Sequence, residues 1–133
     1  MILPSDFSDA TRPLLGNEAF DALAEALEQP QSVSIRLNNK LEETDISSLT
    51  DKVAWCDRGR YLDRRPAFTF DPLLHAGAYY VQEASSMFIE QVVKEAGDSP
   101  IVALDLCAAP GGKSTLLSSV LPKGSLLVAN ELI

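Results

Sequence analysis

The strongest constraint on the fold lies in the last third of the chain, where an apolar run is followed by a loop of small residues. Residues 101–106 (Ile-Val-Ala-Leu-Asp-Leu) form a nearly continuous apolar run, typical of a parallel strand that is covered on both faces. A glycine-containing loop at 107–112, a predicted helix over 113–121 and a predicted strand over 125–129 follow. This order predicts a βαβ unit that opens a doubly wound, Rossmann-like sheet.

The first 75 residues predict a smaller α+β domain. Gly16 is expected to end a first helix and Asn17 to cap a second one, which Pro30 ends. Alternating apolar and polar residues over 32–38 predict a half-buried strand. The other elements expected here are a helix over 5–15, a short helix over 42–49, and a hairpin with strands 53–56 and 60–62 around the turn 57–59.

These patterns divide the chain into a domain over 1–75 and the start of an α/β domain over 76–133. A helix is expected over 84–96, and the side chains predicted to face inward are Met87, Phe88, Val92 and Ala96. Two parallel strands cannot cover their own apolar faces, so we expect a truncated sheet that continues beyond the end of this chain. In the alternative, the α+β domain or a second copy of the chain supplies the cover.

Charge and cysteine content exclude several classes of protein. The 133 residues carry 11 Lys and Arg against 19 Asp and Glu, and the resulting net charge of −8 argues against nonspecific binding of polyanions. No apolar run approaches the roughly 20 residues that a membrane span needs. Two lone cysteines indicate a reducing cytoplasm, and with a single histidine they argue against a structural zinc site. We therefore expect no membrane contact and no metal, while the oligomeric state is left open.

The loop after the first parallel strand carries the clearest chemical signal. A loop of alanine and glycine allows a ligand to approach the backbone, and the helix that follows turns its free N–H groups toward that ligand. Glu131 lies 19 residues after Gly112, close to the separation of about 20 at which an acidic residue accepts hydrogen bonds from ribose in nucleoside-binding folds. The candidate binding residues are Cys107, Ala108, Ala109, Pro110, Gly111, Gly112, Lys113 and Glu131.

Two other interpretations fit this loop. An ordinary strand-to-helix turn would need no ligand, and Glu131 would then be a surface acid. Gly112-Lys113-Ser114 also imitates the end of a phosphate-binding P-loop. That motif requires glycine where Cys107 stands, and Pro110 lacks a backbone N–H for a phosphate, so a P-loop protein is disfavoured.

Three segments resemble one enzyme family. The segment 107–114 (Cys-Ala-Ala-Pro-Gly-Gly-Lys-Ser), preceded by 80–86 (Tyr-Val-Gln-Glu-Ala-Ser-Ser) and followed by 129–131 (Ala-Asn-Glu), resembles the Fmu/Sun (Nop2-type) RNA cytosine-C5 methyltransferases. Leu3-Pro4 and residues 34–38 are similar to bacterial small-subunit rRNA methyltransferases of the RsmF type. The resemblance implies S-adenosylmethionine as the cofactor and a cytosine in rRNA, or in tRNA, as the substrate.

The resemblance also implies roles for single residues. The loop Cys107–Lys113 would line the cofactor, Glu131 would hold its ribose, and a segment beside the site would include Gln82, Glu83 and Ser85. In this family a cysteine thiolate attacks C6 of cytosine and so activates C5, and that cysteine belongs to Pro-Cys and Thr-Cys motifs. The 133 residues contain neither motif, so we expect no catalytic residue and no turnover in this chain.

A non-catalytic RNA-binding module is the alternative from a different class. It would use the basic residues of the segment 52–66, with nearby aromatic rings stacking on bases. The residues concerned are Arg58, Arg60, Arg64 and Arg65 with Trp55, Tyr61 and Phe68. We favour core aromatics beside solvated arginines, a structural role for His75 and a buried Cys56.

Overall fold

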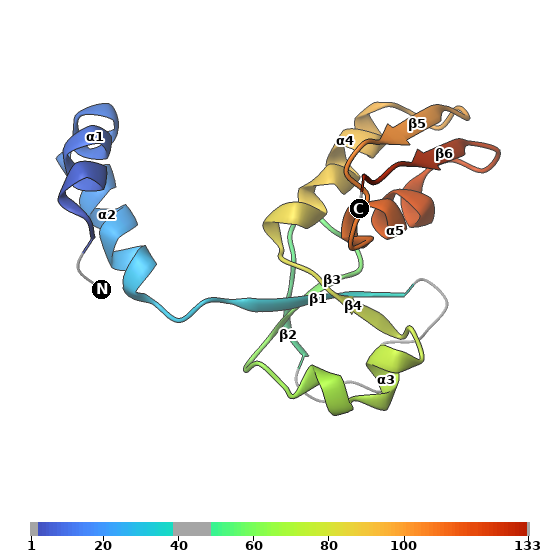
Figure 1. The fold of residues 1–133 in the computed structure, drawn as a ribbon, viewed down its shortest axis with the longest axis horizontal. Coiled ribbons are helices and arrows are strands. Elements are labelled where there is room, and N and C mark those ends of the chain that lie inside the picture. Colours follow the sequence, from blue (N-terminus) through green and yellow to red (C-terminus); the bar gives the residue numbers. More distant parts are fainter. Residues whose placement is uncertain (1–2, 39–48, 133) are drawn as a thin grey trace. The chain divides into compact units, whose positions relative to one another are not determined.

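The computed structural model describes residues 3–38 and 49–132, which contain both helices and sheets (Figure 1). The mixed α/β class expected from the sequence is therefore confirmed. The chain forms two compact units, residues 1–32 and residues 33–133. The short helix expected over 42–49 lies outside the described residues, apart from Leu49, which begins a strand.

The first unit is a pair of helices, α1 (Ser5–Leu15) and α2 (Asn17–Glu28). Gly16 ends α1 as expected, but it is also the N-cap residue of α2, so Asn17 is the first residue of α2 and does not cap it. The reason is the positive φ of Gly16 (79°), which reverses the chain within one residue. Phe20 is buried, and the Arg12 guanidinium lies 4.1 Å from its ring centroid.

The second unit begins with a four-stranded antiparallel sheet in the order β2-β3-β1-β4. Its strands are β1 (Val33–Leu37), β2 (Leu49–Lys52), β3 (Gly59–Leu62) and β4 (Tyr79–Val81). One face of the sheet packs against the 3-10 turn η2 (Phe68–Phe70) and the short helix α3 (Pro72–His75). Ile35 and Leu37 belong to that core, as the alternation predicted. The expectation that the strand is only half-buried is wrong, because Ser34 and Arg36 on its other face are buried as well.

The predicted hairpin is present, but its first strand lies at other residues than predicted. Residues 53–56, expected to be a strand, form a turn, and the strand lies at Leu49–Lys52. These apolar residues are buried without a strand, because the turn points Val53 and Cys56 into a second core with Met87 and Leu116. Backbone bonds from Cys56 N to the Val53 carbonyl (3.1 Å) and from Gly59 N to the Cys56 carbonyl (3.0 Å) close this turn.

The helix expected over 84–96 is two elements, the 3-10 turn η3 (Ser85–Phe88) and α4 (Ile89–Glu95). Met87 faces inward as predicted, whereas Phe88 and Val92 are 54% and 59% exposed and Val93 is buried in their place. The prediction failed because three residues per turn in η3 change the phase of the face that α4 presents.

The last elements confirm the parallel βαβ unit. Strands β5 (Val102–Asp105) and β6 (Leu126–Ala129) pair in parallel, and α5 (Gly112–Val120) connects them. The expectation that β5 is covered on both faces is wrong for the described residues, because Val102 and Leu104 are 76% and 58% exposed. Figure 1 shows the reason, since α5 lies on one side of the strand pair.

The domain boundary expected between residues 75 and 76 stays a prediction. β4 follows that position and pairs with β1 in the four-stranded sheet. The compact unit of residues 33–133 therefore spans the position.

Candidate functional site

The candidate site lies at the carboxyl edge of the parallel pair β5–β6. Asp105 at the end of β5 is in register with Ala129 at the end of β6, so the loop after one strand meets the residues after the other. Asn130 joins the two ends: its N–H donates to the Asp105 carbonyl (2.8 Å), and its carbonyl accepts from Ala108 N (2.9 Å). Its side-chain Nδ2 also donates to the Leu106 carbonyl (3.2 Å).

The carboxylate of Asp105 stabilises the loop by accepting two hydrogen bonds. It accepts from Cys107 N at 3.2 Å through Oδ1 and from Ser114 Oγ at 2.6 Å through Oδ2. Asp105 is 9% exposed, so its carboxylate is largely shielded from water. Neither Asp105 nor Asn130 was among the candidate residues, although an acid that ends an apolar strand just before a glycine-containing loop is a signal that could have pointed to Asp105.

Glu131 lies against the loop, as the sequence spacing required. Its Oε2 accepts from Ala109 N at 2.9 Å, and its Oε1 accepts from Leu132 N at 2.8 Å. The side chain is exposed at the rim of the loop. Since each carboxylate oxygen has two lone pairs, capacity remains for further donors such as sugar hydroxyls.

The two glycines of the loop serve different purposes. Gly111 has φ 104° and no atom within 4 Å of the place where a Cβ would stand, so the backbone is open on that side. A Cβ on Gly112 would instead meet Tyr80 Cε1 at 3.4 Å and Gln82 Nε2 at 3.6 Å. The openness expected of both glycines therefore belongs to Gly111, while a Cβ on Gly112 would lie in ordinary van der Waals contact with Tyr80 and Gln82. Within the described residues, no side chain caps the first turn of α5.

Side chains of β4 and of the residue that follows it hydrogen-bond to the loop and to the start of α5. Tyr80 Oη donates to the Pro110 carbonyl (3.1 Å), and Gln82 Nε2 donates to the Gly112 carbonyl (3.2 Å). Among the described residues, no hydrogen bond joins Glu83 or Ser85 to the loop. Of the three residues expected beside the site, the structure thus places Gln82 in contact with it.

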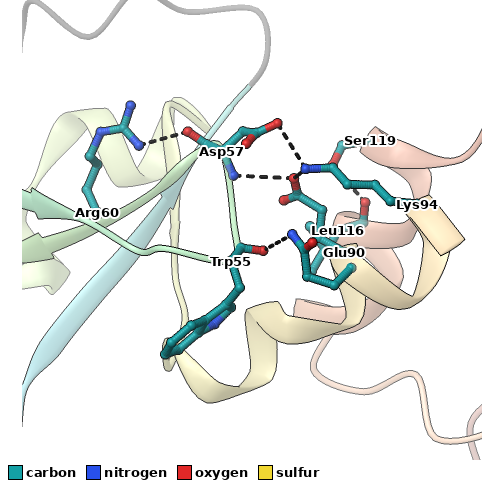
Figure 2. Close-up of polar contacts among 8 residues, drawn as sticks. Trp55, Asp57, Arg60, Glu90, Lys94, Leu116 and Ser119 are labelled. Carbon is teal, nitrogen blue, oxygen red and sulfur yellow. Dashed lines mark hydrogen bonds and ion pairs between the residues drawn. The ribbon is translucent and has the colours of Figure 1, made fainter.

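The turn between β2 and β3 is anchored on α4 (Figure 2). Glu90 Oε1 accepts from Asp57 N at 3.3 Å and from Lys94 Nζ at 2.9 Å, and Lys94 Nζ also lies 3.1 Å from Asp57 Oδ2. Gln91 Nε2 donates to the Trp55 carbonyl at 2.7 Å. These contacts, together with the buried Met87, fix the β2–β3 turn to the helix that precedes β5.

The basic segment is less exposed than expected. Arg60 is 3% exposed, and its Nη1 donates to the Asp57 and Gly59 carbonyls at 2.9 and 2.7 Å. The expectation of solvated arginines is therefore wrong for Arg60, because the tight turn offers its carbonyls as acceptors. Arg64 and Arg65 are exposed, and Phe68 is buried in the core as expected.

His75 makes a hydrogen-bond contact to η2, and the two cysteines differ in burial. His75 Nε2 lies 2.8 Å from the Thr69 carbonyl, which joins α3 to η2. Both cysteines are free thiols: Cys56 is buried as expected, and Cys107 is exposed on the loop. Burial, with a hydrogen bond to Glu90 as the next cause, raises the pKa of Cys56 to about 11.

Because Cys107 is exposed and Cys56 is buried, we expect one thiol per chain to react rapidly with a thiol reagent at pH 8. Cys107→Ser should remove this rapid phase. Cys56 should react only as fast as the chain unfolds, because its thiol is shielded and protonated. Since its pKa of about 11 lies above the ordinary value of 9.0, the stabilisation it contributes is present below pH 9 and is lost as the pH rises toward 11. Two rapidly reacting thiols in the unmodified chain would contradict this assignment.

Neither a metal-binding cluster nor a membrane-spanning helix occurs in the part of the chain that the structure describes. Over residues 3–38 and 49–132, no three His, Cys, Asp or Glu side chains are placed to hold a metal ion. Within the same residues, every helix is too short or too polar to cross a membrane.

The sequence comparisons match one kind of protein, the small-subunit rRNA methyltransferase F. A sequence model of the N-terminal domain of 16S rRNA methyltransferase RsmF matches residues 3–84. Ribosomal RNA small subunit methyltransferase F of Serratia proteamaculans is 30% identical over 98% of this chain, and that of Aliivibrio salmonicida is 34% identical over 85%. The chain spans 30% and 26% of the lengths of these two relatives.

The fold has a solved counterpart. A crystal structure of a methyltransferase homologue from Pyrococcus horikoshii matches 96% of this chain with a TM-score of 0.63 and 26% identity. The chain covers 48% of that protein.

Proposed function

Because the chain belongs to the family described as the N-terminal domain of 16S rRNA methyltransferase RsmF, we propose that it is part of an S-adenosylmethionine-dependent RNA cytosine-C5 methyltransferase. The proposed substrate is small-subunit rRNA. The observation that carries the proposal is the contact between Glu131 Oε2 and Ala109 N at 2.9 Å, which brings the distal acid to the small-residue loop.

The residues at this edge suit an adenosine-bearing ligand. Gly111 leaves its side of the loop open, the first turn of α5 has no side-chain cap among the described residues, and the Glu131 carboxylate stands at the rim. Exposed N–H groups of a helix N-terminus favour the carboxylate end of such a ligand, and a carboxylate accepts from ribose hydroxyls. The proposed ligand contacts are Cys107, Ala108, Ala109, Pro110, Gly111, Gly112, Lys113 and Glu131.

S-adenosylmethionine, when bound, supplies an electrophilic methyl group on a sulfonium. The part this chain takes in the reaction is to bind and orient that donor. Asp105 and Asn130 hold the loop in the shape that the donor meets, and Tyr80 and Gln82 hold its far side through the Pro110 and Gly112 carbonyls. Such positioning lowers a barrier because the reacting groups meet in one geometry.

The chain by itself is proposed to bind without turnover. Neither Cys56, which follows Trp55, nor Cys107, which follows Leu106, stands in a Pro-Cys or Thr-Cys motif. Cys107 lies on the loop and is proposed as a donor contact. We place the protein in the cytoplasm, which the two free thiols support.

The proposal predicts that titration with S-adenosylmethionine shifts the amide resonances of residues 107–113 and of Glu131. Glu131→Ala should weaken binding by about tenfold, because the ribose hydroxyls lose a charged acceptor. Glu95→Ala, which removes an exposed acid on α4, is the matched control and should leave the affinity unchanged. Shifts of the loop with ATP but not with S-adenosylmethionine would overturn the proposal in favour of a nucleotide-binding protein.

A further inference from the structure

Arg36 is a buried cation in the middle of β1. It lies on the sheet face opposite Ile35 and Leu37, and its Nη2 donates to Thr115 Oγ1 on α5 at 2.6 Å. The residue is only 6% exposed, and Nη1 is buried without a hydrogen-bond partner among the described residues. An arginine stays charged in a protein, so the structure holds a positive charge with one unused donor group.

No carboxylate in the described part of the chain forms an ion pair with this guanidinium. Glu90 interacts with it electrostatically, but the Glu90 carboxylate is already bound by Lys94 Nζ at 2.9 Å and by Asp57 N at 3.3 Å. Burial accordingly lowers the pKa of Arg36. A buried charge without a partner is costly, and an anion that supplies the missing acceptor would offset this cost.

Arg36 is among the residues that line a cavity of about 250 Å³ between the four-stranded sheet and α5. Among the described residues that line the cavity none is acidic, and hydroxyl and amide groups predominate among the polar ones. These polar residues are Arg36, Asn38, Tyr79, Tyr80, Thr115 and Ser119. Thr115 Oγ1 and Tyr80 Oη already donate to the Gly111 and Pro110 carbonyls, so Arg36 Nη1 is the charged donor available to an anion here.

The cavity shares residues with the candidate donor site. Tyr80 lines the cavity and also donates to the Pro110 carbonyl, while Thr115 accepts from Arg36 and donates to the Gly111 carbonyl at 2.7 Å. A group bound at Arg36 would therefore lie one helical turn from the loop proposed to bind the methyl donor. Because the chain is acidic overall, its net charge does not attract anions. A buried cation at this cavity would supply that attraction locally.

We propose that the Arg36 cavity binds a backbone phosphate of the substrate RNA. The choice of RNA as the source of the phosphate rests on the proposed function. The guanidinium donates to the phosphate oxygens through Nη1, the group that lacks a hydrogen-bond partner among the described residues.

The first test titrates the unmodified 133-residue chain, without methyl donor, with inorganic phosphate and separately with a short single-stranded RNA. Both should shift the Arg36 side-chain resonance and the amides of Thr115 and Ser119, with RNA acting at the lower concentration. Shifts with phosphate alone would overturn RNA as the source, and no shift with either would overturn the site.

The second test compares variants by RNA affinity over a range of salt concentrations. Arg36→Met should weaken RNA binding by about tenfold and reduce the slope of log K against log salt by about 0.7, as expected for the loss of one phosphate contact to a single strand. Arg36→Lys should retain most of the affinity and the slope. Arg65→Met, which removes an exposed cation, is the matched control.

An equal loss with Arg65→Met, or an unchanged slope with a folded Arg36→Met, would contradict the proposal. The titration of the unmodified chain decides the matter if Arg36→Met does not fold. Neither test contains S-adenosylmethionine, so a failure here leaves the binding of the methyl donor standing, and a failure of donor binding leaves a phosphate site standing.

Discussion

Replacing Met87 with alanine is expected to lower the free energy of unfolding by about 2–5 kcal/mol. Met87 is 0% exposed and lies in the core that joins the β2–β3 turn, η3 and α5, together with Val53, Cys56 and Leu116. Truncation removes buried apolar area and leaves a cavity that surrounding side chains fill only in part. Urea unfolding followed by circular dichroism measures the change.

Phe88→Ala is the matched control for this prediction, because Phe88 is the next residue of η3 and is 54% exposed. We expect it to lower the free energy of unfolding by less than about 1 kcal/mol, since little area leaves water. Equal losses for the two variants would mean that the inward face of η3 has been assigned wrongly.

Replacing Asp105 with alanine is expected to lower the free energy of unfolding by about 2–3 kcal/mol and to abolish the ordered loop. The carboxylate is 9% exposed and accepts both from Cys107 N (3.2 Å) and from Ser114 Oγ (2.6 Å). Without it, two donors at the start of the candidate site lose a charged acceptor. Amide hydrogen exchange at residues 107–114 should rise, and unfolding in urea measures the energy.

Ser114→Ala separates the two contacts of Asp105, because it removes the hydroxyl donor and keeps the bond to Cys107 N. We expect it to lose about half of the energy and to keep slow exchange at Cys107. If Ser114→Ala loosens the loop as much as Asp105→Ala does, then the bond to Cys107 N contributes nothing and this account of the loop is wrong.

The pairing of the loop with Glu131 was predictable because it follows from local preferences and topology. A glycine-containing loop between an apolar strand and a helix predicts a βαβ unit, and parallel strands place their carboxyl ends at one edge. Glu131 and the loop therefore had to meet, and they do at 2.9 Å. The roles of Asp105 and Asn130 needed coordinates, since many acids and amides end strands without binding a neighbouring loop.

The periodicity of apolar residues could not predict which side chains of residues 53–56 and 84–96 face the core. An apolar pair such as Val53 and Cys56 fits both a strand and a turn that closes over a core. In the same way, a 3-10 turn before α4 changes which side chains face inward, and the choice depends on Met87 finding space beside Leu116. Such choices depend on partners distant in the sequence.

The residue pattern alone determined the succession of most elements, the family resemblance and the meeting of the small-residue loop with its distal acid, because these depend on local backbone preferences and on chain order. Only the tertiary structure decided that Arg60 lies buried against turn carbonyls and that Arg36 lies beside α5 without an ion pair to any described carboxylate. The physical reason is that burial and electrostatic pairing are properties of three-dimensional neighbours, which no single segment specifies.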